Sequence, residues 1–158
     1  MKIPDYRYAW RALKYRNYKL FFSGQIVSLI GTWLTTVATS WLVYRLSKEG
    51  GGSAAHSAMV LGVVGFCSQA PQLLLAPFAG VWVDRLSRHK VIVATQFLSM
   101  LQSFALAYLA LSGKITIPQV VVLNFFQGLV NAFDMPARQS LTVDLVEKRE
   151  DLGNAIAL

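Results

Sequence analysis

Residues 58–83 read AMVLGVVGFCSQAPQLLLAPFAGVWV, a run of 26 residues without Asp, Glu, Lys or Arg. A helix needs about 20 apolar residues to cross the roughly 30 Å of hydrocarbon in a bilayer. Backbone N–H and C=O groups in lipid must be satisfied within the protein, and a single run of this kind can do so by forming a helix. The stretch therefore predicts a transmembrane helix, and it decides the class of fold.

Three more stretches without charged residues occur in the chain: Leu20–Tyr44, Val91–Gly113 and Ile115–Phe133. Together the four stretches predict membrane spans over residues 20–46, 58–83, 90–111 and 117–139. The alternative is a set of buried helices in a soluble protein, but such helices are rarely so long and would not recur four times. The composition agrees, because 15% of the residues are charged where soluble domains have about a quarter. We predict an all-α membrane protein.

Basic residues are distributed unevenly between the two sides of the predicted spans. Of the 15 Lys and Arg residues, twelve lie on the side of the N-terminus and three on the other side. This positive-inside bias predicts that the N-terminus and the second connection lie in the cytoplasm. The formal charge of +7 could also suggest nucleic-acid binding, but that requires a basic face on a soluble fold. We therefore predict membrane lipid as the surroundings and no nucleic-acid partner.

The segments outside the spans differ in composition. Residues 1–19 mix cations with aromatic side chains, which predicts a cytoplasmic amphipathic segment in the headgroup layer, followed by a transmembrane domain over residues 20–158. Ser47–Ser57 is rich in Gly, Ser and Ala and predicts a flexible outer loop. The residues from about 152 read as the opening of a fifth apolar helix. We expect the chain to be a fragment that lacks the C-terminal helices of the same protein.

The second connection carries the most specific local pattern, GVWVDRLSRHK over residues 80–90. It resembles the G-x-x-x-D-R-x-G-R-[RK] signature of the major facilitator superfamily, with Ser87 in place of the second glycine and His89 in place of the next basic residue. The resemblance implies a gate motif made of Gly80, Asp84, Arg85 and Arg88. Gly80 would let another helix approach closely, and Asp84 would accept hydrogen bonds from a helix N-terminus. The alternative is a positive-inside loop that only holds the topology.

Further segments are similar to the secretion-effector branch of this superfamily, which includes bacterial enterobactin exporters. They read RNYKLFFSGQ over residues 16–25, WLVY over 41–44 and FDMPARQ over 133–139. The likeness covers essentially the whole chain and implies part of the N-terminal six-helix half of a twelve-helix fold. It also implies a multi-pass protein of the bacterial inner membrane that exports a small molecule, such as a siderophore or a drug, by alternating access.

Polar residues recur at helical spacing on the first and fourth predicted spans. The first stripe is Gln25, Ser28, Thr32, Thr35 and Thr39, and the second is Asn124, Gln127, Asn131, Asp134 and Arg138. Intervals of three and four place each stripe on one face of its helix. The stripes either line a water-filled substrate cavity or hold helices together through hydrogen bonds worth about 1 kcal/mol each. We favour the cavity, because the resemblance places both helices along the central path.

Asp134 is the most informative carboxylate on these stripes. It lies four residues before Arg138 and is expected to pair with it locally. We also predict that Arg88 meets Asp134 when the cytoplasmic side closes. Many proton-coupled relatives carry an R-x-x-Q-G motif in this helix, but Asn124 stands at the arginine position here, so the role of that arginine does not transfer. Protons are the expected coupling ion, with the titrating group near Asp134 or in the missing part.

No feature of the sequence predicts covalent chemistry. A phosphate-binding G-x-x-x-x-G-K-[ST] motif, a metal-ligand cluster and a nucleophile set are all missing, and Cys67 is the one cysteine. We therefore predict no enzyme activity, no cofactor and no metal, with an ion gradient as the energy source. One alternative is a non-transporting membrane scaffold or assembly protein, which would not need the gate motif. The other is a membrane enzyme, for which Asp84, His89 and Asp134 are too few reactive groups.

Overall fold

Four long α-helices account for most of residues 16–144, which are the residues that the computed structural model describes. Their bounds are Arg16–Glu49 for α2, Ala54–Arg85 for α3, Arg88–Leu111 for α4 and Ile117–Asp144 for α5. The shortest helix has 24 residues and at about 1.5 Å per residue reaches roughly 36 Å, enough to cross the hydrocarbon layer. All four are long and apolar enough to be membrane spans. The predicted all-α membrane fold is confirmed.

Each predicted span lies inside a somewhat longer helix. Residues 16–19, which the sequence analysis assigns to the N-terminal surface segment, form the first turn of α2. The rest of that segment, residues 1–15, lies outside the described residues, and so does the predicted start of a fifth helix near residue 152. α2 begins before the predicted span because a helix can continue past its apolar run into the headgroup layer, where its cations remain solvated.

The connection between α2 and α3 is a tight turn, so the predicted flexible loop over Ser47–Ser57 is wrong. Only Gly50–Ser53 lies between the two helices. The buried hydroxyl oxygens of Ser47 and Ser57 lie 3.0 Å apart and share a hydrogen bond. A Cβ at Gly52 would stand 2.7 Å from the carbonyl oxygen of Ser47. The small residues of this segment therefore serve close packing rather than flexibility.

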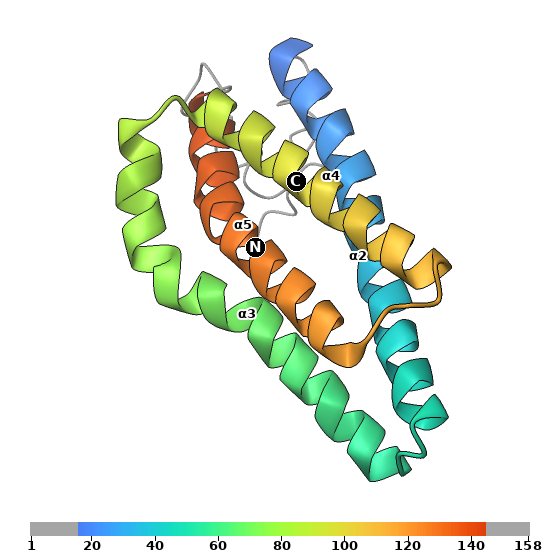
Figure 1. Ribbon diagram of the computed structural model, residues 1–158. Helices are drawn as coiled ribbons and strands as arrows, with labels where there is room; N and C mark the ends of the chain where they lie inside the picture. The colour runs from blue at the N-terminus through green and yellow to red at the C-terminus, as the bar shows by residue number, and fades with distance from the viewer. Residues whose placement is uncertain (1–15, 145–158) are drawn as a thin grey trace, which may run out of the picture.

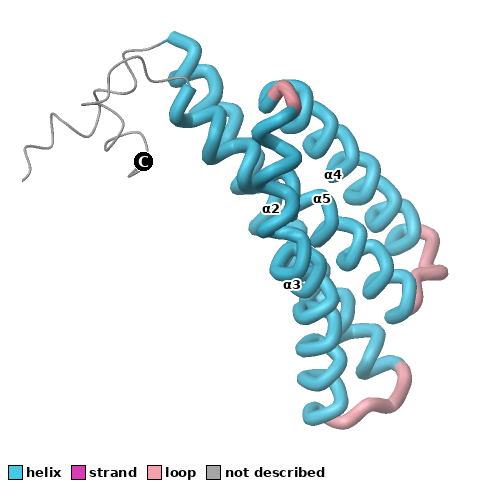
Figure 2. The backbone as a smooth tube through the Cα atoms, turned by 90° about the vertical axis from the view of Figure 1, so that its left-hand side faces the viewer, coloured by secondary structure: helices cyan, strands magenta, loops and turns pink. Residues whose placement is uncertain are grey.

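The four helices run alternately up and down, with α5 at the centre (Figure 1). α5 packs against the other three helices, most extensively against α3 and α4. α2 and α4 begin, and α3 and α5 end, at the same end of the bundle (Figures 1 and 2). We call it the basic end, because its helix termini carry Arg16, Lys19, Arg85, Arg88 and Lys90.

α3 and α5 approach each other closely at Gly128. A Cβ on this residue would overlap the backbone carbonyl oxygen of Ser68 and lie 3.2 Å from the ring of Pro71. Pro71 and Pro77 both lie within α3, which is visibly bent (Figure 1), as expected where proline removes backbone hydrogen bonds. The sequence analysis also predicts a close helix approach at Gly80, and this stays a prediction. No atom of another described helix lies within 4 Å of the position that a Cβ would take there.

Buried apolar residues form a small core toward the end opposite the basic end. The core consists of Val43, Val64, Leu106, Ile115 and Val120. Most other large apolar side chains point outward, among them Trp33, Phe66 and Leu73. The span in α5 is 28% buried, whereas those in α2 and α3 are each 11% buried. So much outward apolar surface would drive association in water, but hydrocarbon solvates it.

Candidate functional site

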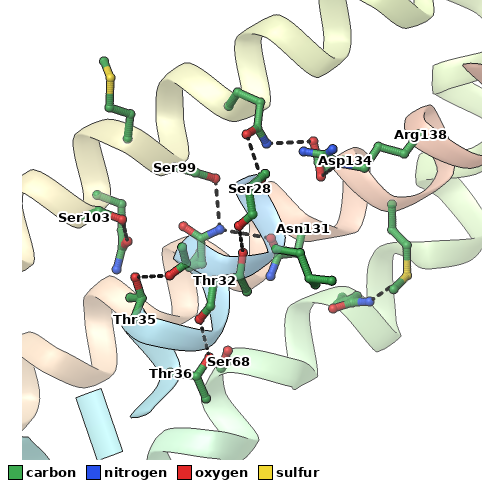
Figure 3. A pocket seen from close by; sticks show the side chains of 18 of the residues that line it. Ser28, Thr32, Thr35, Thr36, Ser68, Ser99, Ser103, Asn131, Asp134 and Arg138 are labelled. Atoms are coloured by element: carbon green, nitrogen blue, oxygen red, sulfur yellow. Dashed lines mark hydrogen bonds and ion pairs between the residues drawn. The ribbon is translucent and has the colours of Figure 1, made fainter. Parts of the chain in front are cut away.

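A groove of about 760 Å³ opens between the four helices, lined largely by hydroxyl and amide side chains (Figure 3). All eight residues that the sequence analysis expects to line a cavity do line this groove: Gln25, Ser28, Thr32, Thr35, Thr39, Asn124, Gln127 and Asn131. Asp134 and Arg138 line it as well. The polar stripes of α2 and α5 therefore face the same space.

The hydroxyl groups on α2 bond mainly within their own helix. Thr32, Thr35 and Thr36 each donate to the backbone carbonyl oxygen four residues earlier, at 3.0, 2.9 and 2.9 Å. Ser28 instead donates to Oε1 of Gln96 on α4, at 3.2 Å. The α2 stripe thus makes few hydrogen bonds to other helices. This argues against the alternative that the α2 stripe serves to hold the helices together.

The α5 stripe both lines the groove and contacts α4. Gln127 donates through Nε2 to Oγ of Ser99 on α4 and to Oδ1 of Asn131, both at 3.0 Å. Asn124 donates to the carbonyl oxygen of Val120 in its own helix, at 2.9 Å. The buried Oε1 of Gln127 has no hydrogen-bond partner among the described residues. On this helix, interhelical bonding and groove lining occur together.

Residues of α3 and α4 also line the groove, and the sequence analysis does not predict them. Gln96, Ser99 and Ser103 contribute from α4, and Gln72 contributes from α3. The three α4 residues recur at intervals of three and four, which places them on one helical face. The spacing rule that identifies the α2 and α5 stripes would therefore have found this shorter stripe.

Asp134 is the centre of a hydrogen-bonded cluster within the span of α5. Arg138 pairs with its Oδ2, as the spacing of four residues predicts. Thr95 of α4 donates to its Oδ1 at 2.5 Å, and Arg138 also donates to Oε1 of Gln25 on α2. The two charged side chains are 15% and 16% exposed. The ion pair therefore joins three helices. Within residues 16–144, no group of three or more His, Cys, Asp or Glu side chains is placed to hold a metal ion.

The gate motif lies at the basic end, on the last turns of α3 and the first residue of α4, around the two-residue turn between them. Nη2 of Arg88 is 4.0 Å from Oδ1 of Asp84, and the Asp84 side chain is 65% exposed. Within residues 16–144 the ion-pair partner of Asp134 is Arg138. The contact between Arg88 and Asp134, predicted for the closed cytoplasmic side, stays a prediction. Each carboxylate is paired with the arginine one helical turn away, where little reorganisation is needed.

The apolar exterior of these membrane-length helices and the polar groove between them define a multi-pass membrane protein with a polar internal path. The family model described as "transmembrane secretion effector" matches residues 8–158 of the chain. The chain therefore belongs to the transmembrane secretion effector family of major facilitator transporters. Members of this family are transporters and not enzymes, in agreement with the sequence-based prediction.

Two named transporters are similar in sequence to this chain. It is 29% identical over 131 residues to the staphyloferrin A transporter of Staphylococcus aureus, with 82% of this chain and 31% of that protein covered. It is 28% identical over 141 residues to macrolide efflux protein A of Streptococcus pyogenes, with 87% and 33% covered. The chain thus spans about a third of the length of both relatives. No solved structure gives a significant match.

Cysteine labelling tests whether the groove holds water. In a Cys67→Ala background, Thr35→Cys and Asn124→Cys place a thiol in the groove, whereas Leu73→Cys places it on the apolar exterior. The cysteine thiolate, which needs water to form, attacks the sulfur of a charged methanethiosulfonate reagent and releases methanesulfinate. We expect both groove cysteines to react with the reagent at least roughly tenfold faster than the exterior cysteine. Equal, slow reaction at all three sites would favour a dry hydrogen-bonded interface.

Proposed function

We propose that the chain forms part of a secondary exporter that moves a small molecule, such as a siderophore or a drug, by alternating access. The groove is the observation that carries the proposal. Its volume of about 760 Å³ falls within the roughly 300–1,000 Å³ of small-molecule sites. A polar solute would find there the hydrogen bonds that it loses on leaving water. Relatives named for transport of staphyloferrin A and for macrolide efflux support the same activity.

The proposal includes an orientation and a gate. The basic end would face the cytoplasm of a bacterial cell across the inner membrane, because cations are retained on that side. The gate residues Gly80, Asp84, Arg85 and Arg88 lie at or near this end, where the contact between Asp84 and Arg88 would form and break as the cytoplasmic side opens. Protons are the proposed coupling ion. Asp134, the one carboxylate among the residues that line the groove, is the first residue at which to test that coupling.

Efflux from intact cells tests the proposal. The complete reading frame that encodes this chain is expressed in a bacterial host without its own drug exporters, and the retention of a panel of siderophores and antibiotics is measured. We expect lower accumulation of at least one compound, and we expect an uncoupler that dissipates the proton gradient to restore it. Asp84→Asn should remove most of this efflux without lowering the amount of protein in the membrane.

Glu49→Gln is the matched control for Asp84→Asn. Glu49 is also an exposed acid at the end of a helix and pairs with Arg45 four residues away, but it lies at the end opposite the gate. We expect this variant to export normally. If every compound accumulates as in cells without the protein, or if Asp84→Asn exports as well as the unchanged protein, a scaffold role is the better interpretation.

A further inference from the structure

Three of the groove-facing hydroxyls on α2 have already committed their hydrogen atoms. Thr32, Thr35 and Thr36 line the groove, and each donates its one hydrogen to a backbone carbonyl oxygen of its own helix. A threonine oxygen keeps its lone pairs when its hydrogen is used in this way. A solute in the groove therefore meets this face of α2 as a row of hydrogen-bond acceptors.

Several amide hydrogens on the facing stripe of α5 are committed in the same sense. Asn124 gives an Nδ2 hydrogen to its own helix, and Gln127 gives Nε2 hydrogens to two oxygens of the protein. The Oε1 of Gln127 is buried and does not meet a solute in the groove. α5 thus offers a solute fewer free hydrogen-bond donors than its amide groups could supply.

The charge that could attract an acidic solute is already neutralised within the groove. Asp134 and Arg138 are the charged residues of the lining, and they are paired with each other. Arg138 is engaged further by Gln25. Other amide hydrogens, such as those of Gln102, are neutral, and a neutral donor binds a carboxylate about half as strongly as a cation does.

We propose that the groove selects cargo that carries hydrogen-bond donors, namely ammonium, amine or hydroxyl groups, over cargo whose polar groups are carboxylates. This inference rests on the proposed export function and narrows its substrate class. The acceptor row on α2 binds N–H and O–H groups directly. A carboxylate brings only further acceptors to these atoms, and the one cation of the lining is already paired with Asp134.

Two dyes built on the same ring system test the inference in cells that express the complete reading frame. Rhodamine 123 is cationic and carries amine N–H groups, whereas 5-carboxyfluorescein is acidic. We expect rhodamine 123 to be exported faster. Thr35→Val, which keeps the shape and removes the acceptor, should slow rhodamine export by roughly three- to tenfold, the effect of one lost hydrogen bond. Thr35→Ser restores the hydroxyl and should export nearly as the unchanged protein does.

Ser40→Ala is the matched control, because Ser40 makes the same bond to its own helix at 2.9 Å but is not among the residues that line the groove. This variant should leave rhodamine export unchanged. Export of carboxyfluorescein at an equal or higher rate, or a Thr35→Val variant that matches the unchanged protein, would overturn the inference and leave the export function standing. Export of neither dye would also overturn it, and the compound panel described above then decides separately whether the protein is an exporter.

Discussion

Arg138→Gln is expected to destabilise the folded protein by about 3–5 kcal/mol, the usual result of removing one partner from a buried ion pair. The change leaves the Asp134 carboxylate within a membrane span, where its side chain is only 15% exposed. The contact between Arg138 and Gln25, which joins α5 to α2, is lost as well. We expect the complete protein to lose transport and to unfold at a lower temperature in detergent, as followed by fluorescence-detected size-exclusion chromatography.

Two controls separate the buried charge from other effects of the substitution. Arg45→Gln breaks a pair with the same spacing of four residues, but its side chains are 67% and 57% exposed, so we expect a cost of at most about 0.5 kcal/mol. The double variant Asp134→Asn with Arg138→Gln removes both charges and should regain most of the lost stability. If Arg138→Gln were no more harmful than Arg45→Gln, the cluster around Asp134 would not hold the bundle together.

Gly128→Ala should destabilise the protein by about 1–3 kcal/mol, the range found for overpacking. The added Cβ would overlap the carbonyl oxygen of Ser68 and lie 3.0 Å from its carbonyl carbon. Both atoms belong to the backbone of α3, so no side chain can rotate away and the two helices must separate. Their contact is the most extensive in the bundle. The thermal unfolding midpoint of the purified protein in detergent measures the effect.

Gly65→Ala is the control for this prediction, and its expected effect has the opposite sign. A Cβ at Gly65 would have no atom of another side chain or helix within 4 Å. Alanine is favoured over glycine within a helix by up to about 1 kcal/mol, so this variant should be neutral or slightly more stable. A midpoint for Gly128→Ala that matches that of Gly65→Ala would show that α3 and α5 are not in close contact at this point.

The spans and the two polar stripes could be predicted because they depend on local properties of the chain. A run such as residues 58–83 must be helical in lipid whatever surrounds it. The position of Thr32 or Gln127 on its helix follows from the helical repeat alone. This is why the predicted lining residues lie in the groove although no contact between helices could be known. The flexible loop was predicted wrongly, because composition alone does not reveal that Gly52 packs against Ser47.

Sequence alone thus determined the membrane class of this protein, the approximate positions of its spans and the polar face of α2 and α5. Only the tertiary structure decided which residues meet across helices: Gly128 at a close contact with α3, and Thr95 and Gln25 around the ion pair of Asp134. These contacts join residues 39 positions apart in one case and 113 in the other. Helical periodicity fixes the direction of a side chain around its own axis, but the distance between two helices depends on how all four pack together.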